Sequence, residues 1–499
     1  MALFQDLETP NGHMYRQPLG LFINNEFVQS IEGGTIPSID PATEELITSV
    51  QSASGRDVDA AVSAAQEALV HPSWKLLSST DRGKLLAKLA DLVEGQMELL
   101  ASIEAWDTGK PYRVTVNEDI PEAVSVLRYY AGWCDKIHGK TISTTVDKFA
   151  YTIRQPVGVV GQIIPWNYPL STATWKLAPA LACGNTIVLK ASELTPLSIL
   201  MLGQLIKLAG FPPGVVNLLN GVGSEAGSRL VEHPHVDKIS FTGSTATAKA
   251  IMSAAAVNLK KITLEAGGKS ALLVFDDADL DQAVRWSHFG VMSNQGQICS
   301  ATSRILVQRT IYKNFIERFI KTVQETSKVG VQWDDATYQG PQASKSQYDK
   351  IISYIETGQA EGATLVLGGK PCLVKGKGYF ISPAVFADVT DSMRIYQEEI
   401  FGPVAVIAAF DSEDEAITKA NCSSYGLAAA IFTRDVKRAH RLSAEVEAGT
   451  VWINSSQDID FRVPFGGVKQ SGFGRELGKA ALEAYSQIKA VHVNMGADI

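Results

Sequence analysis

The middle of the chain alternates short apolar runs with amphipathic stretches. The run Val157–Ile164 is apolar almost throughout and ends at Pro165, which is typical of a strand buried on both faces of a sheet. More such runs follow at regular intervals, with helical periodicity between them. This alternation predicts βαβ crossovers and a doubly wound parallel sheet. The expected strands are 186–190, 215–219, 236–241 and 261–264, and the expected helices are 175–182, 196–210, 223–231 and 245–256.

The segment before this alternation is mainly helical. Residues 21–28 predict a small hairpin, and helical periodicity covers 58–69, 82–106 and 124–133. Asp57 is the cap candidate of the first of these helices.

After residue 280 the alternation continues less regularly and predicts a second α/β domain. The chain then returns through a glycine-rich loop, 464–475, to an apolar strand at 490–493. The regular alternation before residue 280 ends with an expected strand at 271–275. In the less regular part we expect strands at 304–308, 404–410 and 427–432, and helices near 311–328 and 346–361.

Composition narrows the class of protein. The 499 residues are 45% hydrophobic and 20% charged, which is typical of a globular protein of two to four domains. A net charge of −8 and a pI near 5.6 argue against nucleic acid or an anionic membrane as a partner, because both require a basic surface. No apolar run is long enough for a membrane-spanning helix.

The cysteines and histidines show neither the spacing of a disulfide framework nor that of a metal site. The five cysteines are scattered and form no CxxC pair, and the histidines lack metal-ligand spacing. We therefore expect reduced thiols, no bound metal and a cytoplasmic location. The first ten residues show no basic segment that leads into an apolar core, so we expect no signal or transit peptide.

Two glycine-containing turns each follow an expected strand and open an expected helix. Gly221–Gly227 has the spacing GxGxxxG, and Phe241–Ser244 repeats the geometry one strand later. Helix N-termini in this position can bind phosphate through free N–H groups. Each turn alone could be an ordinary tight turn, but two in one sheet favour a dinucleotide site.

Small and amide side chains surround a single thiol, Cys299, in the stretch 293–304. A buried structural Cys is the usual role of an unpaired thiol. Small neighbours and free N–H groups are also what a nucleophile requires if an electrophile is to approach it. The residues alone leave both interpretations open.

Three more polar features favour a ligand site. Asn167 follows an expected strand, where open α/β sheets bind ligands. Lys190 and Glu193 follow the next strand, although they could form a plain surface ion pair. Glu265 precedes two glycines that would let another group come close, although it could be a hydrogen-bonded structural carboxylate.

Taken together, these stretches resemble the NAD(P)-dependent aldehyde dehydrogenase superfamily, with features of betaine-aldehyde and aminoaldehyde dehydrogenases. The resemblance extends from Leu21 to about Val493. Two departures are Ala266, where the family usually has Leu, and Ala191, which is often Pro. The motifs that carry the resemblance are PWNYP at 165–169, TLEAGGKS at 263–270, GQICSATSR at 296–304, EEIFGPV at 398–404 and PFGGVKQSGFGRELG at 464–478.

The resemblance implies the oxidation of an aldehyde to a carboxylic acid. Cys299 would attack the aldehyde to form a thiohemiacetal, and the Asn167 amide and the Cys299 backbone N–H would hold the oxyanion. Loss of hydride would leave a thioester, and Glu265 would activate the water that hydrolyses it.

The same resemblance implies a site for NAD. Lys190 and Glu193 would contact the adenosine ribose, Ser244 the pyrophosphate, and Glu399 with Phe401 the nicotinamide ribose. A carboxylate at Glu193 accepts hydrogen bonds from ribose hydroxyls but repels a 2′-phosphate, which favours NAD over NADP. The other expected cofactor residues are Ile163, Ile164, Pro165, Trp166, Ser192, Gly223, Gly227, Phe241, Thr242, Gly243 and Thr247.

The substrate prediction is an ω-aminoaldehyde or betaine aldehyde. The related enzymes bind a cationic tail between aromatic side chains and two acids, because aromatic faces attract ammonium groups. Asp119 and Glu122 would be the acids, although both could instead form a solvated helix N-terminus. Ser293 stands where that group typically has Trp, which favours a general aliphatic or aromatic aldehyde as the alternative. The remaining expected substrate residues are Tyr168, Trp175, Ile298 and Phe465.

The expected fold is aldehyde dehydrogenase-like. It has a Rossmann-like NAD-binding domain at 1–137 and 155–264, an α/β catalytic domain at 265–468, and a small β oligomerisation element at 138–154 and 479–499. The last of these would pair with another subunit in a homodimer or homotetramer.

Two other classes of function remain open. A catalytically silent binding protein would keep the fold but would have no use for the thiol, the amide and the carboxylate together. An NAD-independent thioester or ester hydrolase could use the same three residues, but it would leave Lys190, Glu193 and Glu399 without a ligand.

Overall fold

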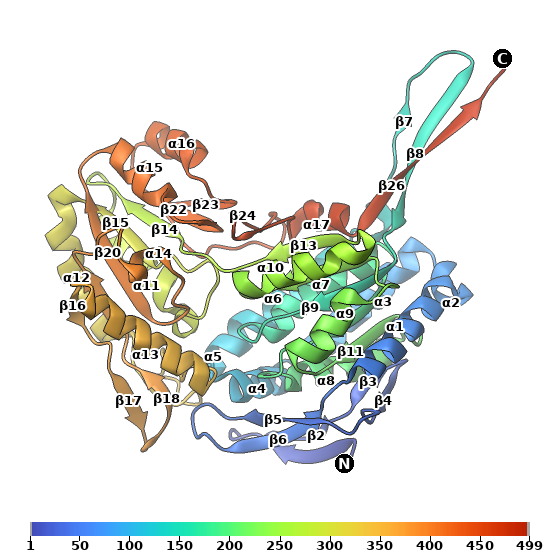
Figure 1. Ribbon diagram of the computed structural model, residues 1–499, viewed down its shortest axis with the longest axis horizontal. Coiled ribbons are helices and arrows are strands. Elements are labelled where there is room, and N and C mark those ends of the chain that lie inside the picture. Colours follow the sequence, from blue (N-terminus) through green and yellow to red (C-terminus); the bar gives the residue numbers. More distant parts are fainter. Residues whose placement is uncertain (1, 497–499) are drawn as a thin grey trace.

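Two large sheets, one in each lobe, organise the computed structural model, which describes residues 2–496 (Figure 1). The first sheet has eight strands, and the five central strands run parallel. An antiparallel strand follows at each side. The order is β25 (Gly472–Phe473), β13 (Lys261–Glu265), β12 (Lys238–Thr242), β9 (Val159–Ile163), β10 (Thr186–Lys190), β11 (Val216–Leu219), β3 (Leu21–Ile23) and β4 (Glu26–Val28). The predicted doubly wound sheet is confirmed.

Helices cover both faces of this sheet because successive strand residues point to opposite sides. Val188 packs into one core, and its neighbours Ile187 and Leu189 pack into the other. The first core contains α1 (Gly55–Val70), α9 (Ser228–Glu232) and α10 (Thr245–Ala255). The second contains α3 (Ser79–Gly95), α4 (Met97–Thr108), α6 (Ile120–Ala131), α7 (Pro169–Ala182) and α8 (Leu197–Ala209).

The second lobe has a seven-stranded sheet that also packs against helices on both faces. Leu273 and Leu306 face the helices α13 (Lys345–Ala360), α14 (Arg394–Gln397), α15 (Glu413–Asn421) and α16 (Val436–Glu445). The opposite face packs against α11 (Leu280–Met292) and α12 (Tyr312–Thr326). The strand order is β16 (Thr364–Leu367), β19 (Ala384–Ala387), β20 (Val404–Phe410), β15 (Arg304–Gln308), β14 (Ala271–Val274), β22 (Ala428–Phe432) and β23 (Thr450–Ile453). The predicted second α/β unit is therefore present.

Smaller strand pairs complete the described chain. Antiparallel pairs form between β1 and β2, β5 and β6, β17 and β18, and β21 and β24. Their bounds are β1 (Phe4–Glu8), β2 (Met14–Pro18), β5 (Thr35–Ile39), β6 (Leu46–Gln51), β17 (Pro371–Val374), β18 (Lys377–Ile381), β21 (Tyr425–Gly426) and β24 (Val468–Lys469). No helix within residues 2–496 is both long and apolar enough to cross a membrane.

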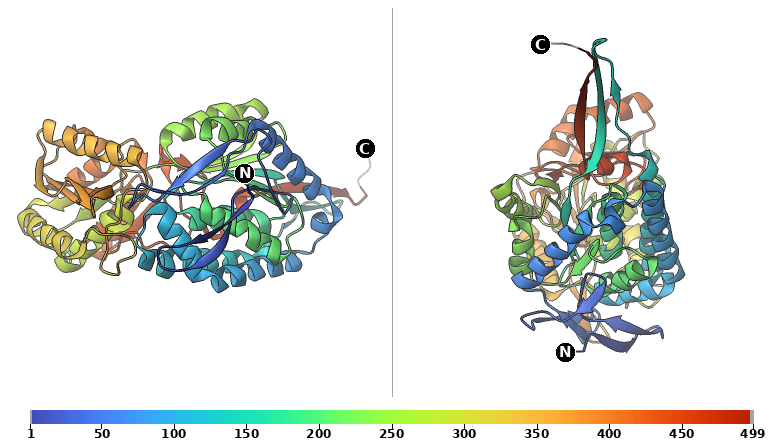
Figure 2. Two further views of the ribbon diagram at one scale, coloured as in Figure 1. Left: turned by 90° about the horizontal axis from the view of Figure 1, so that it is seen from below. Right: turned by 90° about the vertical axis from the view of Figure 1, so that its right-hand side faces the viewer.

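A three-stranded arm projects from the first lobe and carries the C-terminal strand (Figures 1 and 2). It consists of β7 (Thr141–Ile142), β8 (Lys148–Pro156) and β26 (Ser486–Asn494), and β8 pairs with β26 along its whole length. Before β26, α17 (Gly478–Ala484) contacts α7 and contributes to the core of the first lobe. Of the segments predicted for oligomerisation, residues 497–499 lie outside the described residues.

The helices of the N-terminal region differ from the prediction in two places. The expected helix 82–106 is broken at Gln96, where the backbone leaves the helical region between α3 and α4. The sequence does not show this break, because α4 is buried on nearly every side. It therefore has no clear exposed face whose periodicity could be compared with that of α3. Ser54, not Asp57, is the cap residue of α1, and the Asp57 carboxylate accepts the Ser54 backbone N–H at 2.8 Å from the first turn.

Candidate active site

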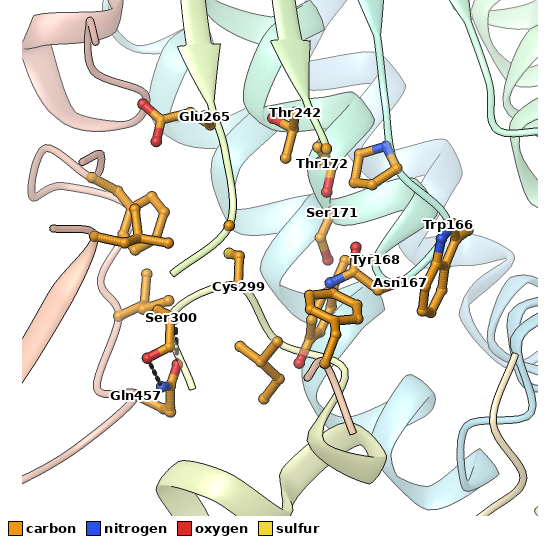
Figure 3. A pocket seen from close by; sticks show the side chains of 18 of the residues that line it. Trp166, Asn167, Tyr168, Ser171, Thr172, Thr242, Glu265, Cys299, Ser300 and Gln457 are labelled. Atoms are coloured by element: carbon orange, nitrogen blue, oxygen red, sulfur yellow. Dashed lines mark hydrogen bonds between the residues drawn. The ribbon is translucent and has the colours of Figure 1, made fainter. Parts of the chain in front are cut away.

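A cavity of about 420 Å³ lies where the carboxyl ends of β9, β12 and β13 meet the segment that precedes β15 (Figure 3). Asn167 and Glu265 come from the first lobe, and Cys299 comes from the second. All three predicted catalytic residues line this cavity. Figure 3 shows Cys299 near the centre of the view, with Glu265 on one side and Asn167 on the other. Residues far apart in sequence thus line one cavity.

An unusual turn precedes Cys299 and places it at the cavity. Helix α11 ends at Met292, and Asn294, Gln295 and Gly296 then all adopt left-handed backbone angles, with φ of 48°, 54° and 70°. A Cβ on Gly296 would lie 2.0 Å from the Gly402 carbonyl oxygen, so only glycine fits at this position. The turn explains why amide and glycine residues precede the thiol.

The Cys299 thiol is partly exposed and faces the cavity. The interpretation as a fully buried structural Cys is therefore wrong. Burial first, and then the carboxylates of Glu399 and Glu265, which repel a thiolate, together raise the pKa of the thiol to about 12. Nucleophilic attack consequently requires either a base or a change in the surrounding charge.

Glu265 ends β13 with only 3% of its surface exposed. Neither carboxylate oxygen has a hydrogen-bond partner of good geometry among the described residues, and the nearby Gly467 backbone N–H opposes the rise in its pKa less than any other group around it, which argues against a satisfied structural carboxylate. Burial holds the pKa of Glu265 well above its usual range, and the Glu476 carboxylate adds to this effect. Glu476 itself forms a buried ion pair with Lys176.

Asn167 lies just beyond β9, and its side-chain Nδ2 donates to the Gln297 backbone oxygen at 2.8 Å. The side chain is 6% exposed. An amide nitrogen carries two hydrogens, so this bond fixes the orientation of the group and leaves one hydrogen for another acceptor.

Several predicted cofactor residues line the same cavity. These are Pro165, Trp166, Thr242, Gly243, Ser244, Glu399 and Phe401. The Trp166 and Phe401 rings meet edge to face with centroids 5.3 Å apart. Glu399 accepts the Gly268 backbone N–H at 3.0 Å, and burial raises the pKa of its carboxyl to about 7.

A second group of predicted cofactor residues lies beside the cavity, at the end of β10. The Lys190 Nζ donates to Glu193 at 3.2 Å and to the Ala191 oxygen at 2.8 Å. The Lys190 side chain is 4% exposed and that of Glu193 is 42% exposed, so the pair is not a plain surface ion pair. A Cβ on Gly227 would lie 3.7 Å from the Lys190 side chain.

The remaining predicted cofactor residues mainly shape the backbone. The Ser244 hydroxyl caps α10 by accepting the Thr247 N–H at 3.2 Å. The Phe241 ring packs under Gly243.

Ile163 is the last residue of β9, and the Ile164 N–H donates to the Lys190 oxygen. Ser192 accepts the Leu194 N–H, and Gly223 opens a π turn, Gly223–Gly227, that replaces the start of the predicted helix 223–231.

All predicted substrate residues line the cavity. They are Asp119, Glu122, Tyr168, Trp175, Ser293, Ile298 and Phe465. Trp175 packs edge to face on Phe465 with centroids 5.5 Å apart, and its Nε1 donates to Glu122 at 3.2 Å. The Ser293 hydroxyl bonds to the Tyr338 hydroxyl at 3.1 Å.

Asp119 and Glu122 do lie at the start of α6, as the alternative expected, but Asp119 is buried there and not solvated. Asp119 is 3% exposed and forms an ion pair of 2.6 Å with Lys110. The Lys110 Nζ also lies 3.3 Å from the centroid of the Tyr168 ring. An ammonium group of the protein itself thus contacts both the acid and the aromatic face that the sequence suggested for a substrate cation.

Sequence reasoning missed part of the cavity wall. Gln457 holds Ser300 through two bonds of 2.7 Å, one to its hydroxyl and one to its carbonyl. Ser300 follows the thiol directly, and Ala266, Gly267 and Glu476 lie in quoted motifs, so these four could have been found. The others lie outside those motifs. The missed residues are Glu118, Ser171, Thr172, Ala266, Gly267, Phe289, Ser300, Gln347, Lys350, Leu427, Gln457, Ile459 and Glu476.

Comparisons with known proteins cover nearly the whole chain. Residues 27–491 match the model of the aldehyde dehydrogenase family. The chain is 52% identical over 495 residues to an aldehyde dehydrogenase from Emericella nidulans, covering 99% of this chain and 98% of that protein. The NAD+ complex of an aldehyde dehydrogenase from Bacillus cereus is 48% identical with a TM-score of 0.94, covering 96% and 97%. A betaine aldehyde dehydrogenase from Staphylococcus aureus, in complex with NAD+, is 41% identical with a TM-score of 0.94, covering 97% and 96%.

Proposed function

Because the chain belongs to the aldehyde dehydrogenase family, we propose that it oxidises an aldehyde to a carboxylic acid with NAD, and that Cys299 is the nucleophile. The observation that carries this proposal is that one thiol, one fixed amide and one unpartnered carboxylate line the same cavity. Each supplies a part that the reaction needs.

The first step forms a carbon–sulfur bond. The Cys299 thiol loses its proton and attacks the aldehyde carbon, and the carbonyl oxygen becomes an oxyanion. The free Asn167 amide hydrogen and the Cys299 backbone N–H would stabilise that oxyanion, each contributing about 2.7–4 kcal/mol if well aligned. Hydride loss from the thiohemiacetal carbon then gives a thioester.

Glu265 would complete the turnover. Its carboxylate removes a proton from water, the water oxygen attacks the thioester carbon, and the carbon–sulfur bond breaks to release the acid and the thiol. A raised pKa suits this role because it makes the carboxylate a stronger base.

The residues of the first lobe fit a dinucleotide. Lys190 and Glu193 offer a cation and a carboxylate to ribose hydroxyls, and the N-terminus of α10 can face a phosphate. The buried Thr242 hydroxyl has no partner among the described residues. NAD, when bound, supplies the acceptor for the hydride. Similarity to NAD+ complexes supports this choice of cofactor.

For the substrate we propose an ω-aminoaldehyde or betaine aldehyde. Glu118, Asp119 and Glu122 bring negative charge to one end of the cavity, and Tyr168 and Trp175 add aromatic faces. Similarity to a betaine aldehyde dehydrogenase agrees with this chemistry. A neutral aliphatic or aromatic aldehyde is the second candidate, because Lys110 already neutralises Asp119 and Ser293 leaves the aromatic wall incomplete.

We further propose that the arm pairs with a second copy of the chain in a dimer or tetramer. Its strands expose apolar side chains, namely Ile142, Val146, Phe149, Ile153, Ile488 and Val493. The two sheets would form a cofactor domain and a catalytic domain around the cavity. Light scattering of the purified protein measures the subunit number directly.

The test of function is the rate of NADH formation with betaine aldehyde, 3-aminopropanal, hexanal and benzaldehyde, each with NAD and with NADP. A higher kcat/KM for the cationic aldehydes with NAD supports the full proposal. A higher kcat/KM for hexanal or benzaldehyde favours the second candidate. If thioester or ester hydrolysis proceeds and no aldehyde reduces either cofactor, the proposal is wrong.

A further inference from the structure

Asn294 lies at the junction of the two loops that would hold the oxyanion. Its side chain is 6% exposed, and its φ of 48° places it in the left-handed turn before the nucleophile. The Nδ2 atom donates to the Gln297 backbone oxygen at 3.1 Å and to the Asn167 backbone oxygen at 3.3 Å. One amide therefore contacts the backbones of both loops.

These two loops belong to different lobes. The loop with Asn167 follows β9 of the eight-stranded sheet, and the loop with Gln297 and Cys299 precedes β15 of the seven-stranded sheet. The Gln297 carbonyl accepts from the Asn167 side chain as well as from Asn294. A carbonyl oxygen has two acceptor sites, so both amides can be satisfied at once.

We propose that Asn294 is a positioning residue that sets the separation of the two oxyanion donors, the Asn167 amide and the Cys299 backbone N–H. This inference rests on the proposed function, because an oxyanion forms at this point only when Cys299 attacks a carbonyl carbon. Donors of this kind act through prior alignment, and a misplacement of about 1 Å can cost about 100-fold in rate.

The residue type fits the position in two ways. Asn tolerates left-handed backbone angles better than other residues with side chains, and its amide supplies the donors that reach both carbonyls. A purely conformational role would need only the first property. The two roles can be separated, because glycine keeps the backbone freedom and removes the amide.

The experiment compares Asn294→Gly, Asn167→Ala and the double variant in a double-mutant cycle. Asn25→Gly is the matched control, because Asn25 also has left-handed angles (φ 63°), is 7% exposed and donates a side-chain bond of 2.7 Å to a backbone carbonyl, that of Phe211. It lies in the β3–β4 hairpin, at the opposite edge of the first sheet from β13. The readouts are kcat and KM for aldehyde and for NAD, and the thermal unfolding midpoint.

We expect Asn294→Gly to lower kcat about 10- to 100-fold and to leave KM for NAD within about twofold. Asn167→Ala should lower kcat about 100- to 1,000-fold. The double variant should match Asn167→Ala within about threefold, because Asn294 acts through the donor that is already lost. Asn25→Gly should lower the unfolding midpoint by as much as Asn294→Gly and leave kcat unchanged.

Two results would overturn the inference. One is a kcat for Asn294→Gly equal to that of Asn25→Gly; the other is a double variant whose losses multiply, which would mean that the two residues act independently. If Asn294→Gly does not fold, Asn294→Asp keeps the shape and removes the donor amide, and it should show the same pattern. A wild-type protein that oxidises no aldehyde would defeat the proposed function, not the placement of Asn294.

Discussion

Glu265 and Asp119 are two carboxylates at different ends of one cavity, and each is 3% exposed. Glu265 has no hydrogen-bond partner among the described residues, whereas Asp119 forms an ion pair of 2.6 Å with Lys110. Burial raises the pKa of both groups, but only at Asp119 does a cation oppose that rise at hydrogen-bond distance. At equal burial, Glu265 is thus free for proton transfer, whereas the charge of Asp119 is neutralised by Lys110.

The comparison separates two kinds of acid in a binding cavity. An unpartnered buried carboxylate has its basicity available for chemistry, at a cost in stability. A carboxylate that already has a cation contributes mainly to structure, because removing either partner leaves an uncompensated buried charge. Substitutions at Cys299, Glu265, Lys110 and Glu122 test this distinction, with expected effects that decrease in that order.

Removing the thiol should have the largest effect. Cys299→Ala should lower aldehyde oxidation by at least about 10⁴-fold, since no other group can form the covalent intermediate. Steady-state NADH formation measures the loss, and a wild-type unfolding midpoint would show that the fold is intact. Oxidation within about tenfold of wild type would mean that Cys299 is not the nucleophile.

Replacing the free carboxylate should have the next largest effect. Glu265→Gln should lower kcat about 10²- to 10⁴-fold, which is the range for loss of a general base. Stability should not fall, because the variant no longer buries an unpartnered ionisable group. Both kcat and the urea unfolding midpoint of the variant are compared with those of the wild type. A variant that is less stable but has normal kcat would mean that Glu265 is structural, which is the role assigned here to Asp119.

Breaking the ion pair should affect stability more than chemistry. Lys110→Met should destabilise the protein by about 3–5 kcal/mol, because Asp119 would remain buried without its cation. The double variant Lys110→Met with Asp119→Leu should recover most of that loss. Urea unfolding of Lys110→Met, Asp119→Leu and the double variant measures the coupling energy between the two side chains. If the losses in unfolding free energy simply add, the two residues do not form a tight pair.

Glu122 should show the smallest effect, and it should be specific to charge. Burial and the Asp119 carboxylate raise its pKa to about 7, so Glu122 is neutral below that pH and negative above it. Attraction of a fixed cation is therefore lost as the pH falls through 7. KM for betaine aldehyde should decrease about three- to tenfold between pH 6 and pH 8, and Glu122→Gln should abolish this change.

Hexanal is the control for that experiment. Its KM should not follow the ionisation of Glu122, because it carries no charge. An equal pH dependence for both aldehydes would assign the titration to a catalytic step and would remove Glu122 as a substrate anchor.

Much of this architecture could be predicted from the sequence. The strands of both sheets have strong apolar patterns, and the polar residues at their carboxyl ends, such as Asn167 and Glu265, lie where parallel sheets place ligands. The break at Gln96 could not be predicted, because α4 buries polar as well as apolar residues on nearly every side and so has no clear exposed face. The pairing of Lys110 with Asp119 depends on tertiary packing around Tyr168, which no local pattern reports.

The left-handed turn before Cys299 shows the same limit. Small and amide residues indicated an unusual loop, but the need for glycine at 296 comes from the Gly402 carbonyl, more than 100 positions away in sequence. The network of Asn167, Asn294 and Gln297 likewise exists only after the two lobes meet.

The most direct test of the account is a single-turnover experiment with Glu265→Gln, NAD and hexanal. If Cys299 forms the thioester and Glu265 drives its hydrolysis, a stoichiometric burst of NADH should appear, and intact-protein mass spectrometry should find a hexanoyl adduct on Cys299. A burst without the adduct, full turnover at the wild-type rate, or an adduct that forms without NADH would contradict the account.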